Sequence, residues 1–155
     1  MSKIRVIVDS NVFVNSWFST KYFYCDAVID LINNDEIELL FSQDTIGELA
    51  YVVKKIVLDV HKEEKEMQIE YMNNISYIFL NATSINTKGV ICPNIKDKFD
   101  KMFLETAIKG KADYVVSEDK NSGMHEVKLF YGTKVVDSED FIKMYERLRV
   151  GLLVE

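Results

Sequence analysis

The sequence predicts an α/β fold: a single domain with a mainly parallel central sheet of about four to five strands, flanked by helices in an α/β/α sandwich. Strand-like and helix-like segments alternate along the 155 residues, which is typical of parallel sheets with right-handed crossovers. Two apolar runs, residues 4–8 and 112–116, have the continuous pattern of strands that are buried on both faces, and each is followed by an aspartate, Asp9 or Asp119.

The first half of the chain predicts two strands and two helices. Residues 3–9 form the first expected strand, and a turn and a short helical segment follow it. A helix is expected over residues 21–33, because its apolar positions recur at helical spacing. Residues 36–41 are the second expected strand. Ser42 is then placed to cap a helix, since its hydroxyl can accept a bond from an amide of the first turn.

The second half of the chain continues the alternation. After the only proline, Pro93, a loop leads to a helix that Gly110 is expected to end. The expected elements, in order, are a charged helix at 62–80, a short strand near 84–87, a helix at 98–109, strands at 113–117 and 134–136, and a final helix from a cap at Ser138 to about residue 149.

Composition limits the classes of function. The net charge of −6 argues against a general nucleic-acid coat protein, which is normally basic, and suits a basic protein partner. Cys25 and Cys92 are far apart and show no metal-ligand spacing, so reduced thiols are expected. No stretch has the character of a signal peptide or of the roughly 20-residue apolar run of a membrane span. We therefore expect a cytoplasmic protein without a membrane partner.

Four acidic residues fall where this layout can bring them together. Asp9 ends the first strand, Glu48 lies in the helix after the second, Asp100 opens the helix before the strand at 113–117, and Asp119 follows that strand. Ligands bind beyond the carboxyl ends of strands in such sheets. Clustered carboxylates repel one another unless a cation joins them, and oxygen ligands suit Mg²⁺ or Mn²⁺. The sequence therefore predicts a site for a hard divalent cation.

These motifs together resemble a PIN domain, in particular the bacterial branch of VapC-like toxins of toxin–antitoxin systems. The resemblance extends from residue 4 to about residue 144 and places a PIN-like nuclease domain at residues 1–150, followed by a short tail at 151–155. It rests, in order, on Asp9-Ser10-Asn11-Val12-Phe13-Val14, Ser42 with Glu48, Asp97-x-x-Asp100 with Ala107, the run from Ala112 to Asp119, and the run from Val135 to Phe141.

The resemblance implies a Mg²⁺- or Mn²⁺-dependent endoribonuclease, the toxin of a type II system, with an RNA substrate, a cognate antitoxin and a possible homodimer as partners. It assigns catalysis to Asp9, Glu48, Asp100 and Asp119, and the metal to Asp9, Asp100 and Asp119. Supporting roles fall to Ser10, Asn11, Ser117, Asn121 and Asp97. Many relatives have an acid where this chain has Asn121, which leaves the number of metal ions open.

Simpler interpretations stand beside these assignments. Asp9 and Asp97 suit helix caps, Glu48 suits a solvated helix face, and Asp119 suits a turn. Lysines that flank the acids are candidates for RNA contact or for an ordinary charged surface: Lys96, Lys98, Lys101 and Lys120. A non-catalytic PIN-like binding or scaffold domain is the main alternative function. A phosphatase with Asp9 as its nucleophile is a weaker alternative, because the motif of such enzymes has a second aspartate two residues later, where this chain has Asn11.

Overall fold

The computed structural model describes residues 2–92, 98–121, 124–125, 129–130 and 132–153. Its strands are β1 (Arg5–Val8), β2 (Glu38–Phe41), β3 (Thr83–Ser84), β4 (Tyr114–Val116), β5 (Leu129–Phe130) and β6 (Thr133–Val136). Its helices are α1 (Ser10–Phe18), α2 (Phe23–Asn33), α3 (Gln43–Val60), α4 (Lys65–Asn81), α5 (Lys98–Gly110) and α6 (Ser138–Leu153).

Within these described residues the strands form one sheet in the order β3-β2-β1-β4-β6-β5. All neighbouring pairs are parallel except β5 and β6, which are antiparallel. The predicted α/β fold with a mainly parallel sheet is confirmed. The short antiparallel strand β5 was not predicted, since two residues are too few to produce a sequence pattern.

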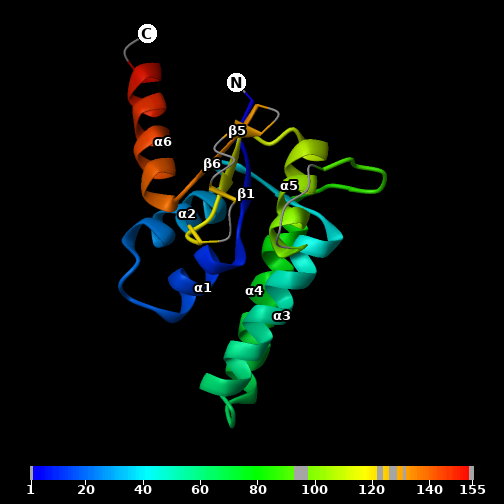
Figure 1. The fold of residues 1–155 in the computed structure, drawn as a ribbon. Coiled ribbons are helices and arrows are strands. Elements are labelled where there is room, and N and C mark those ends of the chain that lie inside the picture. Colours follow the sequence, from blue (N-terminus) through cyan, green and yellow to red (C-terminus); the bar gives the residue numbers. More distant parts are fainter. Residues whose placement is uncertain (1, 93–97, 122–123, 126–128, 131, 154–155) are drawn as a thin grey trace.

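Alternate residues of the strands build two cores on opposite faces of the sheet. Val6 and Phe41 pack on the face covered by α1, α2, α3, α4 and α6, whereas Ile7 and Leu40 pack against α5. Figure 1 shows α5 on the other side of the strands from α2 and α6. Gly110, the last residue of α5, lies so close to the sheet that a Cβ atom there would be 2.8 Å from Leu40 Cδ1. Glycine suits this close approach, because any larger residue would require the Leu40 side chain to shift.

Helices α3 and α4 pack against each other and project beyond the sheet (Figure 1). Helix α3 begins with the cap predicted from the sequence: the Ser42 hydroxyl accepts a bond from the Thr45 amide, and the Thr45 hydroxyl accepts one from the Ser42 amide. This capping box fixes the direction in which α3 leaves the end of β2.

The predicted cap of the final helix was wrong by one residue. Asp137 Oδ1 accepts a bond from the Asp140 amide at 2.8 Å, so Asp137 caps α6 and Ser138 is its first helical residue. Both residue types cap helices well, and a tertiary contact decides between them: the Ser138 amide donates to Glu118. The helix also runs to Leu153 rather than to about residue 149.

No helix in the described part of the chain combines the length and the apolar character needed to cross a membrane.

Candidate active site

Asp9 lies at the end of β1, in the N-cap position of α1, but its side chain makes no capping bond to that helix. The carboxylate instead accepts bonds from Ser117 Oγ at 2.6 Å and from Asn11 Nδ2 at 3.0 Å. Asp9 is only 8% exposed. A role as a simple helix cap therefore does not explain where this carboxylate points.

Burial raises the pKa of Asp9 above its usual value, and the negative charge of Asp119 adds to the increase. Hydrogen bonds from Ser117, the Ser10 amide and Asn11 act in the opposite direction but do not cancel the effect of burial. None of the groups that shift the pKa of Asp9 carries a positive charge, so the ionised Asp9 carboxylate is not neutralised by them. A bound cation would supply that charge.

Asp119 is brought next to Asp9 by the pairing of β1 with β4. The Asp9 amide donates to Val116 O at 2.9 Å, and Asp119 follows three residues beyond that carbonyl. The Asp119 amide donates to Ser117 Oγ at 3.2 Å, so one buried hydroxyl connects the Asp9 carboxylate to the backbone of Asp119. Asp119 Oδ1 accepts a bond from the Asn121 amide at 2.9 Å, which fixes the turn after the strand.

Glu48 also reaches this edge of the sheet. Its Oε2 accepts a bond from Ser10 Oγ at 2.7 Å, which joins α3 to the first residue of α1. Ser10 is buried and directly follows Asp9. The structure therefore places Glu48 beside the site and not on a purely solvated helix face.

The remaining candidate positions are described only in part. Lys96 and Asp97 lie outside the described residues, and so do the side chains of Lys98 and Asp100 in the first turn of α5. Lys101 Nζ lies 3.7 Å from Glu105, and Lys120 Nζ lies 2.8 Å from Asp137 Oδ2. These two lysines are exposed and pair with acids of the chain itself.

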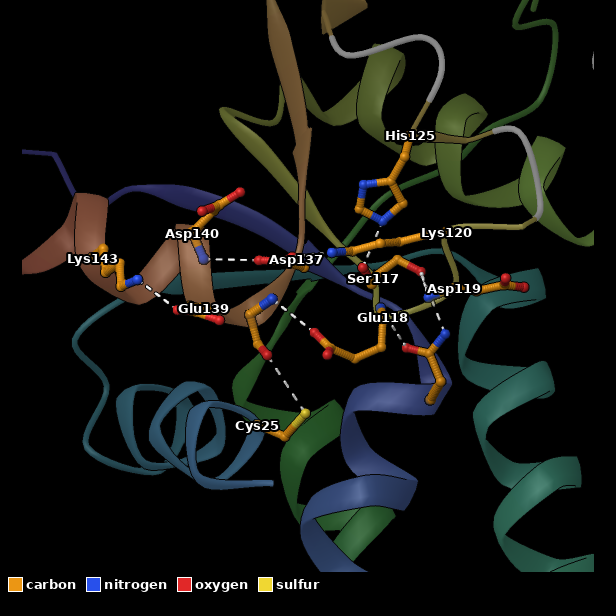
Figure 2. A network of polar contacts seen from close by, with 12 residues as sticks. Cys25, Ser117, Glu118, Asp119, Lys120, His125, Asp137, Glu139, Asp140 and Lys143 are labelled. Atoms are coloured by element: carbon orange, nitrogen blue, oxygen red, sulfur yellow. Dashed lines mark hydrogen bonds and ion pairs between the residues drawn. The ribbon is translucent and has the colours of Figure 1, made fainter. Parts of the chain in front are cut away.

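The structure also places His125 at the site, which no pattern in the sequence predicts. Its Nε2 lies 2.7 Å from the carbonyl oxygen of Ser117 (Figure 2). A carbonyl oxygen only accepts hydrogen bonds, so Nε2 carries the proton of this contact. His125 therefore holds the backbone of the residue whose hydroxyl joins Asp9 to Asp119. A single histidine in a loop has no spacing that could have revealed this contact.

Glu118, although adjacent to Asp119 in sequence, has a structural role: it joins the loop after β4 to α1 and α6. Its amide donates to Asn11 Oδ1 at 3.1 Å, and its Oε1 accepts a bond from the Ser138 amide at 2.7 Å. In Figure 2 the carboxylates of Glu118 and Asp119 point to opposite sides of the loop. Glu118 therefore ties the loop to the start of α6 and does not add a charge to the acid pair.

The donor set suits a hard cation. The described residues hold no group of three or more His, Cys, Asp or Glu side chains that could enclose a metal. However, Mg²⁺ typically binds through one or two carboxylates and keeps waters or substrate phosphates as its other ligands. The Asp9 and Asp119 pair, whose hydrogen-bond partners include the Ser117 hydroxyl and the Asn11 amide, fits such a cation.

The comparisons with known proteins agree with this architecture. The model of the PIN domain matches residues 5–121. Similar solved structures include VapBC2 from Rickettsia felis bound to a DNA fragment from its promoter (TM-score 0.49, 18% identity, 86% of this chain and 98% of that chain). They also include FitAB bound to an IR36 DNA fragment (TM-score 0.51, 15% identity, 86% of this chain and 94% of that chain).

No curated protein matches the sequence significantly. At this identity the likeness to FitAB supports the fold alone. The family match is broader, because it includes β1, β4 and the loop that carries Asp119, together with the helices between them. The chain therefore belongs to the PIN-domain family.

Proposed function

We propose that this protein is a metal-dependent endoribonuclease that hydrolyses RNA phosphodiester bonds. The observation that supports this most directly is the pair of carboxylates, Asp9 and Asp119, at the carboxyl ends of adjacent parallel strands and joined by Ser117. PIN domains are in general nucleases, which gives this geometry its reaction class.

Asp9 and Asp119, with Asp100, are the proposed ligands of Mg²⁺ or Mn²⁺, and Glu48 completes the catalytic set. When bound, the cation would supply Lewis acidity and charge neutralisation to phosphodiester hydrolysis. The other residues orient the acids: Ser117 and Asn11 hold the Asp9 carboxylate, and Ser10 holds that of Glu48. Glu48 is proposed to orient the attacking water.

The proposed biological role is that of the toxin in a type II toxin–antitoxin system, in the cytoplasm. A net charge of −6 suits a basic antitoxin. Tyr51, Leu58, Val60 and Ile69, on the projecting α3 and α4 pair, expose apolar side chains that a protein partner could cover. Co-expression with the protein of an adjacent reading frame, followed by co-purification, tests this role, and an antitoxin must also suppress the cleavage activity. A homodimer is a second proposed assembly, which light scattering would detect.

Incubation with a defined set of RNAs tests the activity. Cleavage is expected with Mn²⁺ or Mg²⁺, none with EDTA, and none for Asp9→Asn, because that change removes a ligand charge. Asp59→Asn, which alters an exposed acid near the far end of α3, is the matched control and retains cleavage. Cleavage that persists in EDTA, or in a folded Asp9→Asn variant, contradicts the proposal.

The alternative is a PIN domain that binds a partner or RNA without cleaving it. Asn121 favours it, because its side chain brings no negative charge to a position where many relatives have an acid. Calorimetric titration separates the two: millimolar Mn²⁺ that produces no binding heat supports the scaffold, whereas saturable binding that Asp9→Asn abolishes supports the nuclease.

A further inference from the structure

A cavity of about 630 Å³ opens at the carboxyl ends of β2 and β3, outside the acid site. We propose that it binds one nucleotide of a single-stranded RNA substrate next to the bond that is cut, and that it selects the base. This inference rests on the proposed function and names a contact with its substrate. The lining residues that carry the argument are Phe41 and Phe79 on its apolar side, and Gln43, Asp44, Asn86 and Lys88 on its polar side.

The cavity adjoins the acid site through one turn of α3. Asp44 lines the cavity, and Glu48, four residues later on the same helix, is bonded to Ser10 beside Asp9. Side chains four residues apart share a helix face, with Cβ atoms about 5–6 Å apart. Parallel strands also place the ends of β1 and β2 at the same edge of the sheet. A strand of RNA with a phosphate at Asp9 is therefore within reach of this cavity.

The apolar side of the cavity suits the ring of a base. Phe79 is partly exposed and is the ring available to a base, whereas Phe41 is buried in the core next to it, with ring centroids 6.5 Å apart and planes inclined at 54°. Ile46 and Ile85 extend this apolar surface. Proteins that read RNA sequence commonly hold an unpaired base against such aromatic side chains. The volume is also within the ordinary range of small-molecule sites, roughly 300–1,000 Å³.

The polar side of the cavity carries side-chain groups that are not used in hydrogen bonds or ion pairs within the described part of the chain. Gln43, Asp44 and Lys88 are exposed, and none of their side chains takes part in a hydrogen bond or ion pair among the described residues. Asn86 Oδ1 accepts a bond from the Lys88 amide at 3.0 Å, so its Nδ2 faces no partner within the same part of the chain. Two amides, a carboxylate and an ammonium group thus surround one cavity.

This set predicts which base is preferred. The amides of Gln43 and Asn86 can each donate to and accept from the edge of a base, and the ammonium group of Lys88 suits a phosphate. The carboxylate of Asp44 only accepts, so it favours bases with an exocyclic amino group and disfavours uracil. We therefore expect cytosine, adenine or guanine at this position.

Titration of the Asp9→Asn protein with the four nucleoside 5′-monophosphates in EDTA, followed by NMR of the backbone amides, tests binding without cleavage. Shifts are expected at Gln43, Asn86 and Lys88, with uridine monophosphate the weakest ligand. Gln43→Ala and Asn86→Ala should each weaken binding about tenfold, the size expected for a lost hydrogen bond. Asn74→Ala and Lys55→Ala, which alter exposed residues elsewhere on α3 and α4, are matched controls that bind normally.

Cleavage of an RNA pool with randomised sequence by the protein with intact acids gives the second measurement. The cut sites should exclude uracil at one flanking position, and Asp44→Asn should admit it, because an amide can donate to the O4 atom of uracil. Unchanged base preference in the Asp44→Asn variant, or nucleotide-induced shifts only outside the cavity, overturns the inference. A protein that binds nucleotides here but cuts no RNA contradicts the proposed function instead, so the two failures are distinguishable.

Discussion

Ser117 Oγ donates a hydrogen bond of 2.6 Å to Asp9 Oδ2 and accepts one of 3.2 Å from the Asp119 amide. A hydroxyl has one proton to donate and can accept through its lone pairs, so a single buried atom makes both contacts. The two acids come from strands that are more than a hundred residues apart in sequence. Ser117 thereby links the Asp9 carboxylate to the backbone of Asp119, the two residues on which the proposed chemistry depends.

Ser117→Ala is expected to lower the free energy of unfolding by about 1–3 kcal/mol, because the buried Asp9 carboxylate loses its shortest hydrogen bond. It is also expected to weaken Mn²⁺ binding. Denaturation in urea and calorimetric titration measure the two effects. Ser76→Ala removes an exposed serine that bonds only to the backbone of its own helix, so it serves as the control. Equal Mn²⁺ affinity in Ser117→Ala and the native protein would refute the positioning role.

Asp9→Asn is expected to stabilise the metal-free protein at neutral pH, since it removes a buried charge. The sign follows from the raised pKa of Asp9 in the folded state. Below pH 3.8, the pKa of an unfolded aspartate, Asp9 is neutral in both states and its burial costs no charge. As the pH rises through the higher pKa of folded Asp9, the native protein loses stability, because a buried carboxylate must ionise. The gain from Asp9→Asn should thus be present at pH 7 and disappear toward pH 3, in thermal unfolding measured across that range.

With Mn²⁺ bound, the native protein is expected to become more stable than Asp9→Asn, the reverse of the order without metal. A ligand at about one hundred times its dissociation constant stabilises a folded protein by about 2.7 kcal/mol, which is a rise in Tm of roughly 5–11 °C for a chain of this length. The native protein should show that rise and Asp9→Asn should not. The same rise in both proteins would place the metal elsewhere.

The sequence predicted Asp9 and Asp119 because Asp9 directly follows, and Asp119 closely follows, a strand whose apolar run is easily recognised. It also predicted the cap of α3, since Ser42 and Thr45 act within one turn of helix. It could not show that Glu118 faces α6 or that His125 reaches Ser117, because both contacts depend on how distant segments pack. The same limit explains the shift of the α6 cap from Ser138 to Asp137.

His125→Ala is expected to lower kcat and to raise the Mn²⁺ concentration needed for half-maximal cleavage, each by about tenfold, because the Ser117 backbone loses its hydrogen-bond partner. His125→Gln should restore much of the activity, since Nε2 of glutamine can donate to the same carbonyl oxygen. His61→Ala removes the other histidine, which interacts with Glu64 at the far end of α3, and should have no effect. Failure of glutamine to rescue would point to a different role for the ring.

Asp137→Ala is expected to cost about 0.5–2 kcal/mol of stability at pH 7, the usual range for a lost helix cap. Burial raises the pKa of Asp137, but bonds from the Asp140 amide and Lys120 outweigh it and lower the pKa below 3.8. The contribution is therefore present above that value and lost as the pH falls, so native and variant stabilities should converge in acid. Asp137→Asn, which keeps a capping side chain, should remain close to the native protein at pH 7.

Arg5 stands at the opposite end of β1 from Asp9, and there its guanidinium group bonds to Gly110 O at 2.9 Å and to Glu38 Oε1 at 2.8 Å. The Arg5 amide donates to Asp113 Oδ2 at 2.8 Å. This cross-link fastens α5, β2 and β4 at the rim remote from the acids. Substitutions at this rim are therefore expected to change the thermal stability of the domain without altering the geometry around Asp9 and Asp119.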